Sequence, residues 1–282
     1  MQLSPRYGPH PVIRIEPFEH DPIELMVQQR RRLQATLASL DDAQWRAPSR
    51  CAGWSVQDVV IHLATVNSFW AFSITSGLAG RPSTFLSTFD PVSGPAEMVT
   101  AAGGPAPSDT LSALAASDAA LAEAAHQAGD RLWTAVAEAP PGHVSVGALA
   151  LHALWDAHVH ERDIVLPLGI APVEDAGEID AALRYAAALS PTFLATLGST
   201  RSATIEVRAE DPHVGFVVDV AETVVVRAAA GVSVSSPVVL RGRAIELLEA
   251  LSRRAPIEPF VDPGDLWLFD GLARVFDQSN AV

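Results

Sequence analysis

The amino-acid sequence changes character at Pro172, and no other feature constrains the fold as strongly. Before this residue, apolar side chains recur at intervals of three and four over long stretches, which predicts amphipathic helices. After it, short runs rich in β-branched residues predict strands. These runs are SATIEVRA, VGFVVDV, ETVVVRAA and VSVSSPVVL. We therefore expect two domains, a helical domain over residues 1–172 and a small α+β domain over residues 173–282.

The N-terminal half contains long stretches with helical periodicity, and a set of this kind is typical of a four-helix bundle. The helices are expected at about 22–40, 56–77, 108–137 and 146–166. Residues 1–20 contain four prolines and are expected to form an irregular arm. Residues 80–107 are rich in Pro, Gly, Ser and Thr, which predicts a long excursion of the kind that is often functional or mobile.

The C-terminal half begins with one more helix near Glu178, which either ends before Pro191 or kinks there toward Leu197. The strand runs are then expected to form an antiparallel sheet. Two amphipathic segments, GRAIELLEALSRR and GDLWLFDGLARVF, are expected to cover one face of that sheet. The expected fold class is α+β, with a helical bundle followed by a small domain built on an antiparallel sheet.

Composition excludes several classes of function. The formal charge of −14 argues against non-specific nucleic-acid binding, and the one basic run, Arg30–Arg32, is expected on a solvated helix face. We find no signal-peptide pattern and no uninterrupted apolar run of membrane-spanning length, so we expect a cytoplasmic protein without a membrane partner. Cys51 is the single cysteine, so no intrachain disulfide can form. The sequence leaves the oligomeric state open.

The stretch CAGWSVQDVVIHLA, residues 51–64, contains a histidine that needs an explanation. Ser55 is expected to cap the helix, with Asp58 completing a capping box, and valines follow at helical spacing. His62 lies among these valines. Taken alone, such a residue is best interpreted as a core histidine with one satisfied hydrogen bond.

The stretch LHALWDAHVHERDIVLPLG supplies possible companions for His62. Asp156 and His160 are four residues apart, so they share one face of a helix and can take adjacent positions on one metal ion. His62 from a neighbouring helix would complete a three-ligand set with open positions. His152 and Asp163 extend the same stripe by a turn in either direction. A helix-surface pair is the alternative for the Asp156–His160 spacing alone.

The other two titratable residues of this stretch, His158 and Glu161, point away from that stripe. We therefore expect both on the surface.

These two motifs resemble those of a known family. GWSVQDVVIHLA is similar to the signature of DinB-like proteins of the mycothiol-dependent maleylpyruvate isomerase family, and DAHVHERDIVLPLG is similar to its second conserved segment. The C-terminal half resembles the family's accessory domain, which has a sterol-carrier-like fold. All 19 basic residues are arginine and the chain is rich in alanine, a composition that fits a GC-rich actinobacterium, the group that makes mycothiol.

The resemblance implies a divalent metal, usually zinc, held by His, Glu and His. Carried over, these ligands and catalytic residues are His62, Asp156 and His160. The sequence departs from the family at Asp156, whose side chain is one methylene shorter, and this lets His152 compete as a ligand. The resemblance also implies that Asp163 orients His160, with a helix cap as the alternative.

The implied chemistry is activation of the thiol of mycothiol, because metal coordination deprotonates a thiol whose pKa is otherwise about 8–9. The thiolate would attack a small electrophilic metabolite. We expect S-transfer or thiol exchange. The alternatives are cis–trans isomerisation of the maleylpyruvate type, metal-dependent hydrolysis on the same scaffold, and a non-catalytic binding protein, which the Asp156 substitution favours.

Mycothiol is a polar sugar thiol, so arginines near the domain junction are candidate anchors. We expect this role for Arg81, Arg241 and Arg243, with solvated surface positions as the alternative. Substrate specificity is expected from residues 78–107 and from the N-terminal arm.

Cys51 is predicted not to be catalytic. If the helix reached back to it, the eleven residues between Cys51 and His62 would separate their Cα atoms by about 16 Å. A protein thiol would also lack a resolving cysteine and would duplicate the thiol of the cofactor.

Overall fold

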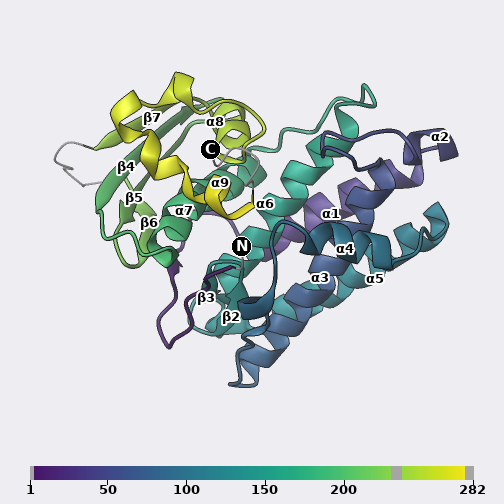
Figure 1. The fold of residues 1–282 in the computed structure, drawn as a ribbon, viewed down its shortest axis with the longest axis horizontal. Coiled ribbons are helices and arrows are strands. Elements are labelled where there is room, and N and C mark those ends of the chain that lie inside the picture. Colours follow the sequence, from purple (N-terminus) through teal and green to yellow (C-terminus); the bar gives the residue numbers. More distant parts are fainter. Residues whose placement is uncertain (1–2, 230–236, 277–282) are drawn as a thin grey trace.

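The bundle helices begin where polar caps meet apolar periodicity. The computed structural model describes residues 3–229 and 237–276. Ser55 caps its helix and Asp58 bonds back to the Ser55 backbone, so the expected capping box is confirmed. The long helices are α1 (Pro22–Ala38), α3 (Val56–Leu78), α5 (Pro107–His126) and α6 (Val146–Val165). They pack against one another as the predicted bundle (Figure 1). In the sequence, the short α2 (Asp42–Trp45) follows α1 and the short α4 (Gly94–Ala101) follows α3.

The segment after α5 differs from the prediction. The helix expected to continue to Ala137 ends at His126, and a hairpin follows, formed by β2 (Val136–Ala139) and β3 (Gly142–Ser145). Gly142 has φ +128°, where a Cβ would meet the backbone of Arg6. The excursion over residues 80–107 contains a 3-10 helix, Phe85–Thr88, as well as α4.

The sheet is mixed, so the prediction of an antiparallel sheet is wrong in detail. Its order is β1-β6-β5-β4-β7. Tight turns join β4 (Ala203–Glu210), β5 (Val214–Val220) and β6 (Val224–Ala228), and these three pair antiparallel. β7 (Val238–Arg243) pairs parallel with β4, and β1 (Ile13–Ile15) pairs parallel with β6, because no hairpin joins either strand to its neighbour. The first part of the expected fourth run, residues 232–236, lies outside the described residues.

The N-terminal arm, expected to be irregular, supplies β1. Ile13 and Ile15 are buried while Arg14 between them is exposed, the alternation of a half-buried strand. The arm therefore crosses from the bundle side to the sheet of the C-terminal half (Figure 1).

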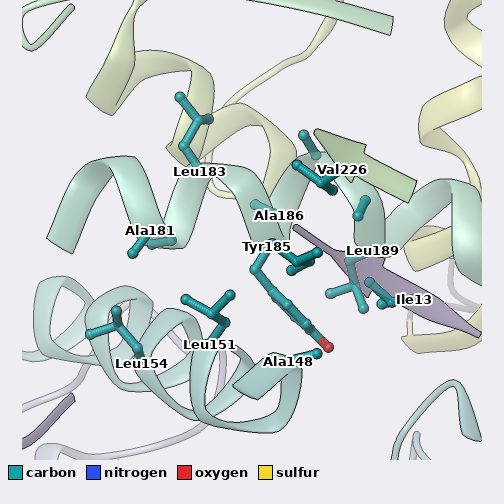
Figure 2. Packing of buried hydrophobic residues seen from close by; sticks show 14 of the residues in the cluster. Ile13, Ala148, Leu151, Leu154, Ala181, Leu183, Tyr185, Ala186, Leu189 and Val226 are labelled. Carbon is teal, nitrogen blue, oxygen red and sulfur yellow. The ribbon is translucent and has the colours of Figure 1, made fainter. Parts of the chain in front are cut away.

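The helix α7 (Ala176–Thr196) lies between the bundle and the sheet. It continues past Pro191 to Thr196, so the helix does not end before this proline. Of the two expected outcomes, continuation toward Leu197 is the one observed. Figure 2 shows Tyr185 and Leu189 of α7 among Leu151 of α6, Ile13 of β1 and Val226 of β6. These residues belong to one cluster, so the bundle and the sheet share a continuous apolar core.

The helices α8 (Ala244–Leu251) and α9 (Gly271–Phe276) complete the C-terminal half. A 3-10 helix, Pro263–Phe269, precedes α9, so the segment GDLWLFDGLARVF forms two short helices instead of one. Both α8 and α9 pack against α7.

The arginine run on α1 is not a solvated face as a whole: Arg31 is exposed, but the expectation is wrong for Arg30 and Arg32. Arg30 is 3% exposed, and its Nε lies 2.9 Å from Oδ1 of Asp118 on α5. Arg32 pairs with Glu161 of α6 and Glu178 of α7 at 2.9 and 2.6 Å. Because α1 packs between other helices, its arginines cross-link the bundle.

One described helix is long and apolar enough to cross a membrane by length and composition. This helix is α3, with a mean hydropathy of 1.3 in the relevant window, half of which is buried inside the protein. Its position between α5 and α6 is that of a core helix, which passes the same test.

Candidate active site

A cavity of about 520 Å³ is lined by residues of α3, α6, α7 and α9. The loop before α3, the segment 85–98 and the turn after α8 also contribute. Segment 85–98 lies within the excursion expected to set specificity, and Leu3 of the N-terminal arm lines the cavity as well. A volume of this size accommodates a small ligand.

The three residues proposed as metal ligands meet at one end of this cavity. The Nε2 atoms of His62 and His160 lie 3.9 and 3.6 Å from the two carboxylate oxygens of Asp156. Ligand atoms of all three residues lie within 4.8 Å of one another. The helices α3 and α6 therefore bring together residues that are far apart in the sequence, as the motif spacing predicts.

His62 is held as a neutral imidazole. Burial lowers its pKa to about 4, although the nearby Asp156 carboxylate acts in the opposite direction. Its Nδ1 atom is buried and has no hydrogen-bond partner. The ring lies between Trp54 and His160, with centroid separations of 5.4 and 5.1 Å. A neutral imidazole is the form that can bind a metal, and the atom of His62 that faces Asp156 is Nε2.

His160 is oriented by a second carboxylate. Its Nδ1 lies 3.0 Å from Asp163, which is fully buried. Burial lowers the pKa of His160, but Asp156 and a hydrogen bond to Asp163 outweigh it and raise that pKa to about 10. The expected contact between Asp163 and His160 is thus present, and it turns Nε2 toward Asp156.

His152 does not join the cluster, although it lines the cavity. Its Nδ1 lies 3.0 Å from the Tyr185 hydroxyl, and its ring contacts Trp70 and Trp155. The geometry therefore favours Asp156 over His152 as the third ligand atom.

The surface positions expected for His158 and Glu161 are wrong. Their exposed fractions are 2% and 4%. Glu161 accepts hydrogen bonds from Gln29 and Arg32 of α1, while neither ring nitrogen of His158 has a partner. Because α1, α3, α7 and the hairpin surround α6, no face of this helix is open to solvent.

Cys51 lies closer to the cluster than its sequence position suggests. Its Sγ is 3.6 Å from Nδ1 of His160 and 3.2 Å from Oδ2 of Asp163. The loop before α3 turns back onto α6, where the Arg50 backbone N–H donates to the Asp163 carbonyl. The expected helical separation therefore does not apply.

Cys51, His160 and Asp163 form a second group that could hold a metal ion. However, the guanidinium of Arg254 bonds to both Asp163 oxygens, with a shortest distance of 2.7 Å. This positive charge disfavours a cation there.

The arginines expected to bind mycothiol lie elsewhere. Arg81, Arg241 and Arg243 are exposed, none of them lines the cavity, and Arg243 pairs with Asp211 at 2.8 Å. The cationic residues that do line it, within the described residues, are Arg253 and Arg254 at the end of the segment LSRR. No spacing or motif in the sequence points to these two.

The fold and the cluster define a class: a helical bundle that presents a His–Asp–His group to a cavity, joined to an α+β unit. Residues 26–165 match the sequence model of the mycothiol maleylpyruvate isomerase N-terminal domain, and the chain belongs to the mycothiol-dependent maleylpyruvate isomerase family. No curated protein matches the sequence at a significant level.

Two crystal structures share the fold. One is a histidine-to-alanine variant of the mycothiol-dependent maleylpyruvate isomerase, with 16% identity, a TM-score of 0.57, and coverage of 85% of this chain and 90% of that chain. The other is the mycothiol-dependent maleylpyruvate isomerase itself, with 16% identity, a TM-score of 0.55, and coverage of 83% and 88%. At this identity the likeness establishes the two-domain α+β fold.

Proposed function

We propose that this protein is a metal-dependent enzyme that joins mycothiol, through its sulfur, to a small electrophilic metabolite. The observation that carries the proposal is the convergence of His62, Asp156 and His160 at one end of a cavity with room for a small molecule. Both reactants are small molecules, and we place the reaction in the cytoplasm of an actinobacterium, where mycothiol is made.

The donor set fits a divalent ion such as Zn²⁺. Two imidazole nitrogens and a carboxylate oxygen are ordinary zinc ligands, and catalytic zinc sites keep one position open. Ligand atoms at ~2.0–2.1 Å from a tetrahedral ion lie about 3.3–3.5 Å apart. The separations of 3.6 and 3.9 Å around Asp156 are close to this value, so the shorter side chain of aspartate reaches both histidines.

The residues around the cluster prepare it for this role. Asp163 accepts the Nδ1 proton of His160, so Nε2 faces the cluster and would bind a metal ion that displaces the Nε2 proton. Trp54 packs beside His62 and limits the access of water to the cluster. When bound, the metal lowers the pKa of the mycothiol thiol, so that the cofactor reacts as a thiolate.

The proposed reaction is the addition of a thiol across a conjugated carbon–carbon double bond. The sulfur forms a bond to the β-carbon, and the π electrons move to the carbon beside the carbonyl. A proton then reaches that carbon, replacing the one that the thiol released to solvent. The product retains the thiol as a thioether.

A second candidate function is cis–trans isomerisation, which the names of the two structures that share the fold favour. It uses the same addition, followed by rotation about the former double bond and elimination of the thiol. The two reactions differ in whether mycothiol is consumed.

The test is to incubate zinc-loaded protein with mycothiol and a conjugated enone and to follow free thiol and product. We expect free thiol to be consumed and product to form only when zinc and mycothiol are both present. We expect this reaction to be lost in His62→Ala. His126→Ala, which removes an exposed imidazole on α5, should behave like the unmodified protein. Recovery of all thiol with an isomerised product would support the second candidate. Turnover of an ester that needs zinc and no thiol would instead indicate a hydrolase, and no turnover of either substrate a binding protein.

A further inference from the structure

The two ends of the cavity differ sharply in chemistry. The polar end contains the His62–Asp156–His160 cluster together with Cys51, and Arg253 and Arg254 lie on the turn after α8. The rest of the lining is apolar except for Thr65, His152 and Ser252, and it includes eight Phe and Trp side chains. A substrate that reaches the cluster can therefore place its remaining part against apolar and aromatic side chains.

The aromatic wall is built from separate parts of the chain: Phe69 and Trp70 on α3, Phe85 and Phe89 in the excursion, Phe193 on α7 and Phe276 on α9. The rings of Phe69 and Phe85 lie 5.6 Å apart. Phe85 is 63% exposed although it lines the cavity, so its apolar surface is available to a ligand. Exposed aromatic surface at a cavity is typical of a binding site for an apolar group.

No cation lies along this wall among the lining residues that the structure describes. The two arginines of the lining are adjacent in sequence, and the guanidinium of Arg254 is bonded to the Asp163 carboxylate at 2.7 and 2.9 Å. Asp156 adds a negative charge at the cluster. A carboxylate placed against the aromatic wall would lose its hydration and gain no ionic partner, which is unfavourable.

We propose that the electrophile has an apolar, ring-sized group beside its reactive carbon, and that this group is uncharged and bears no carboxylate. This inference rests on the proposed function, since it names the substrate class of that reaction. The electrophilic carbon lies at the polar end, where the thiol sulfur bonds to it, and the ring lies against Phe69 and Phe85. The bonds formed and broken are those of the thiol addition given above.

A matched pair of enones tests the proposal. Benzylideneacetone has an uncharged phenyl ring beside its β-carbon, and its para-carboxyl derivative differs by one charge at the far end. Zinc-loaded protein is assayed with mycothiol and each enone, and each rate is divided by the rate without protein. We expect kcat/KM for the phenyl compound to exceed that for the carboxylate by tenfold or more.

Binding provides a second measurement that does not depend on turnover. Benzylacetone and its para-carboxyl derivative lack the double bond, so they bind without reacting, and calorimetry on the zinc-loaded protein gives their Kd values. We expect benzylacetone to bind at least tenfold more tightly. Phe85→Ala should reduce this preference by threefold or more. Phe72→Ala is the matched control, because Phe72 is also exposed, at 54%, and does not line the cavity.

The outcomes separate this inference from the proposed function. Thiol-dependent turnover that is equal or faster with the carboxylate overturns the substrate class and leaves the function in place. Selective binding of benzylacetone without any turnover supports the apolar site and counts against the function. Equal binding of both analogues, or equal effects of Phe85→Ala and Phe72→Ala, overturns the inference directly.

Discussion

Two groups of buried polar residues share α6 and differ in how their atoms are paired. Toward α1, Glu161 accepts hydrogen bonds from Gln29 and from Arg32, at 2.9–3.1 Å for Arg32. Toward the cavity, Asp156 lies 3.6 and 3.9 Å from two histidine nitrogens, beyond hydrogen-bond distance. The first group connects helices through hydrogen bonds. In the second group the side chains lie close together, but Asp156 makes no hydrogen bond to either histidine.

This difference is informative because burial alone does not identify a functional residue. Buried polar groups in proteins are nearly always hydrogen-bonded, so a partly buried cluster that lacks these bonds beside a cavity indicates a ligand or a reaction. The buried carboxylates of Glu161 and Asp118 obey this rule, because each has partners on α1, and these contacts are structural. The His62–Asp156–His160 cluster departs from it beside a cavity, which is where a ligand can supply the missing contacts.

The largest effect is expected when one member of the buried ion pair between Arg30 and Asp118 is removed. Arg30→Met leaves the buried carboxylate of Asp118 without its 2.9 Å partner. We expect the free energy of unfolding to fall by about 3–5 kcal/mol, because one member of a buried ion pair is removed. Urea denaturation measures this loss. A loss below about 1 kcal/mol would contradict the structural role.

The second prediction concerns the two histidines of the His62–Asp156–His160 cluster. His62→Ala and His160→Ala should each lose the bound divalent ion, which we expect at about one per chain in the unmodified protein. Thiol-dependent turnover should fall by a hundredfold or more, about 3 kcal/mol, while both variants stay folded. Metal analysis and circular dichroism check this. Full metal content in both variants would show that the cluster is not the metal site.

Local patterns in the sequence were sufficient to predict much of this arrangement. The capping box at Ser55 and Asp58 depends on neighbouring residues, and the shared face of Asp156 and His160 depends on helical spacing. The strands joined by tight turns are likewise determined by short stretches of chain. Such features can be predicted because the interacting residues are close in sequence.

The missed features depend on how the elements pack. The pairing of β1 with β6 joins residues at opposite ends of the chain, and no turn encodes it. His158 and Glu161 are polar, so periodicity placed them outside, but α6 is covered on every side. The return of the loop at Cys51 onto Asp163 is also a tertiary contact. Spacing within one segment contains no information about these neighbours.

A smaller effect is expected at two buried histidines that differ in their hydrogen bonds, His158 and His143. Burial lowers the pKa of His158 to about 4, so its ring is neutral at pH 7, and neither nitrogen has a partner. His158→Leu should therefore raise the free energy of unfolding by about 1 kcal/mol. In His143, by contrast, both ring nitrogens lie 3.0 Å from backbone carbonyl oxygens. His143→Leu should therefore lower the free energy of unfolding by about 1–3 kcal/mol. Urea denaturation at pH 7 compares the two, and equal losses would show that His158 has partners after all.

The smallest expected effect concerns Cys51, which touches the cluster without belonging to it. Its S–H donates to Asp163, a carboxylate whose pKa is held below its usual range by hydrogen bonds from His160 and Arg254 despite burial. The thiol proton is thus directed away from the cavity cluster, and within the chain no other cysteine can resolve an intermediate. We therefore expect the sulfur that reacts to be that of mycothiol.

Cys51→Ala removes one weak hydrogen bond to Asp163 and leaves the bonds from His160 and Arg254 in place. Mycothiol-dependent turnover in Cys51→Ala and Cys51→Ser should therefore stay within about threefold of the unmodified protein, a difference below ~1 kcal/mol. Steady-state kinetics with zinc-loaded protein measure this. If both variants lost turnover while keeping their metal and fold, the attacking thiolate would belong to the protein, and Cys51 would join the cavity cluster in function as well as in position.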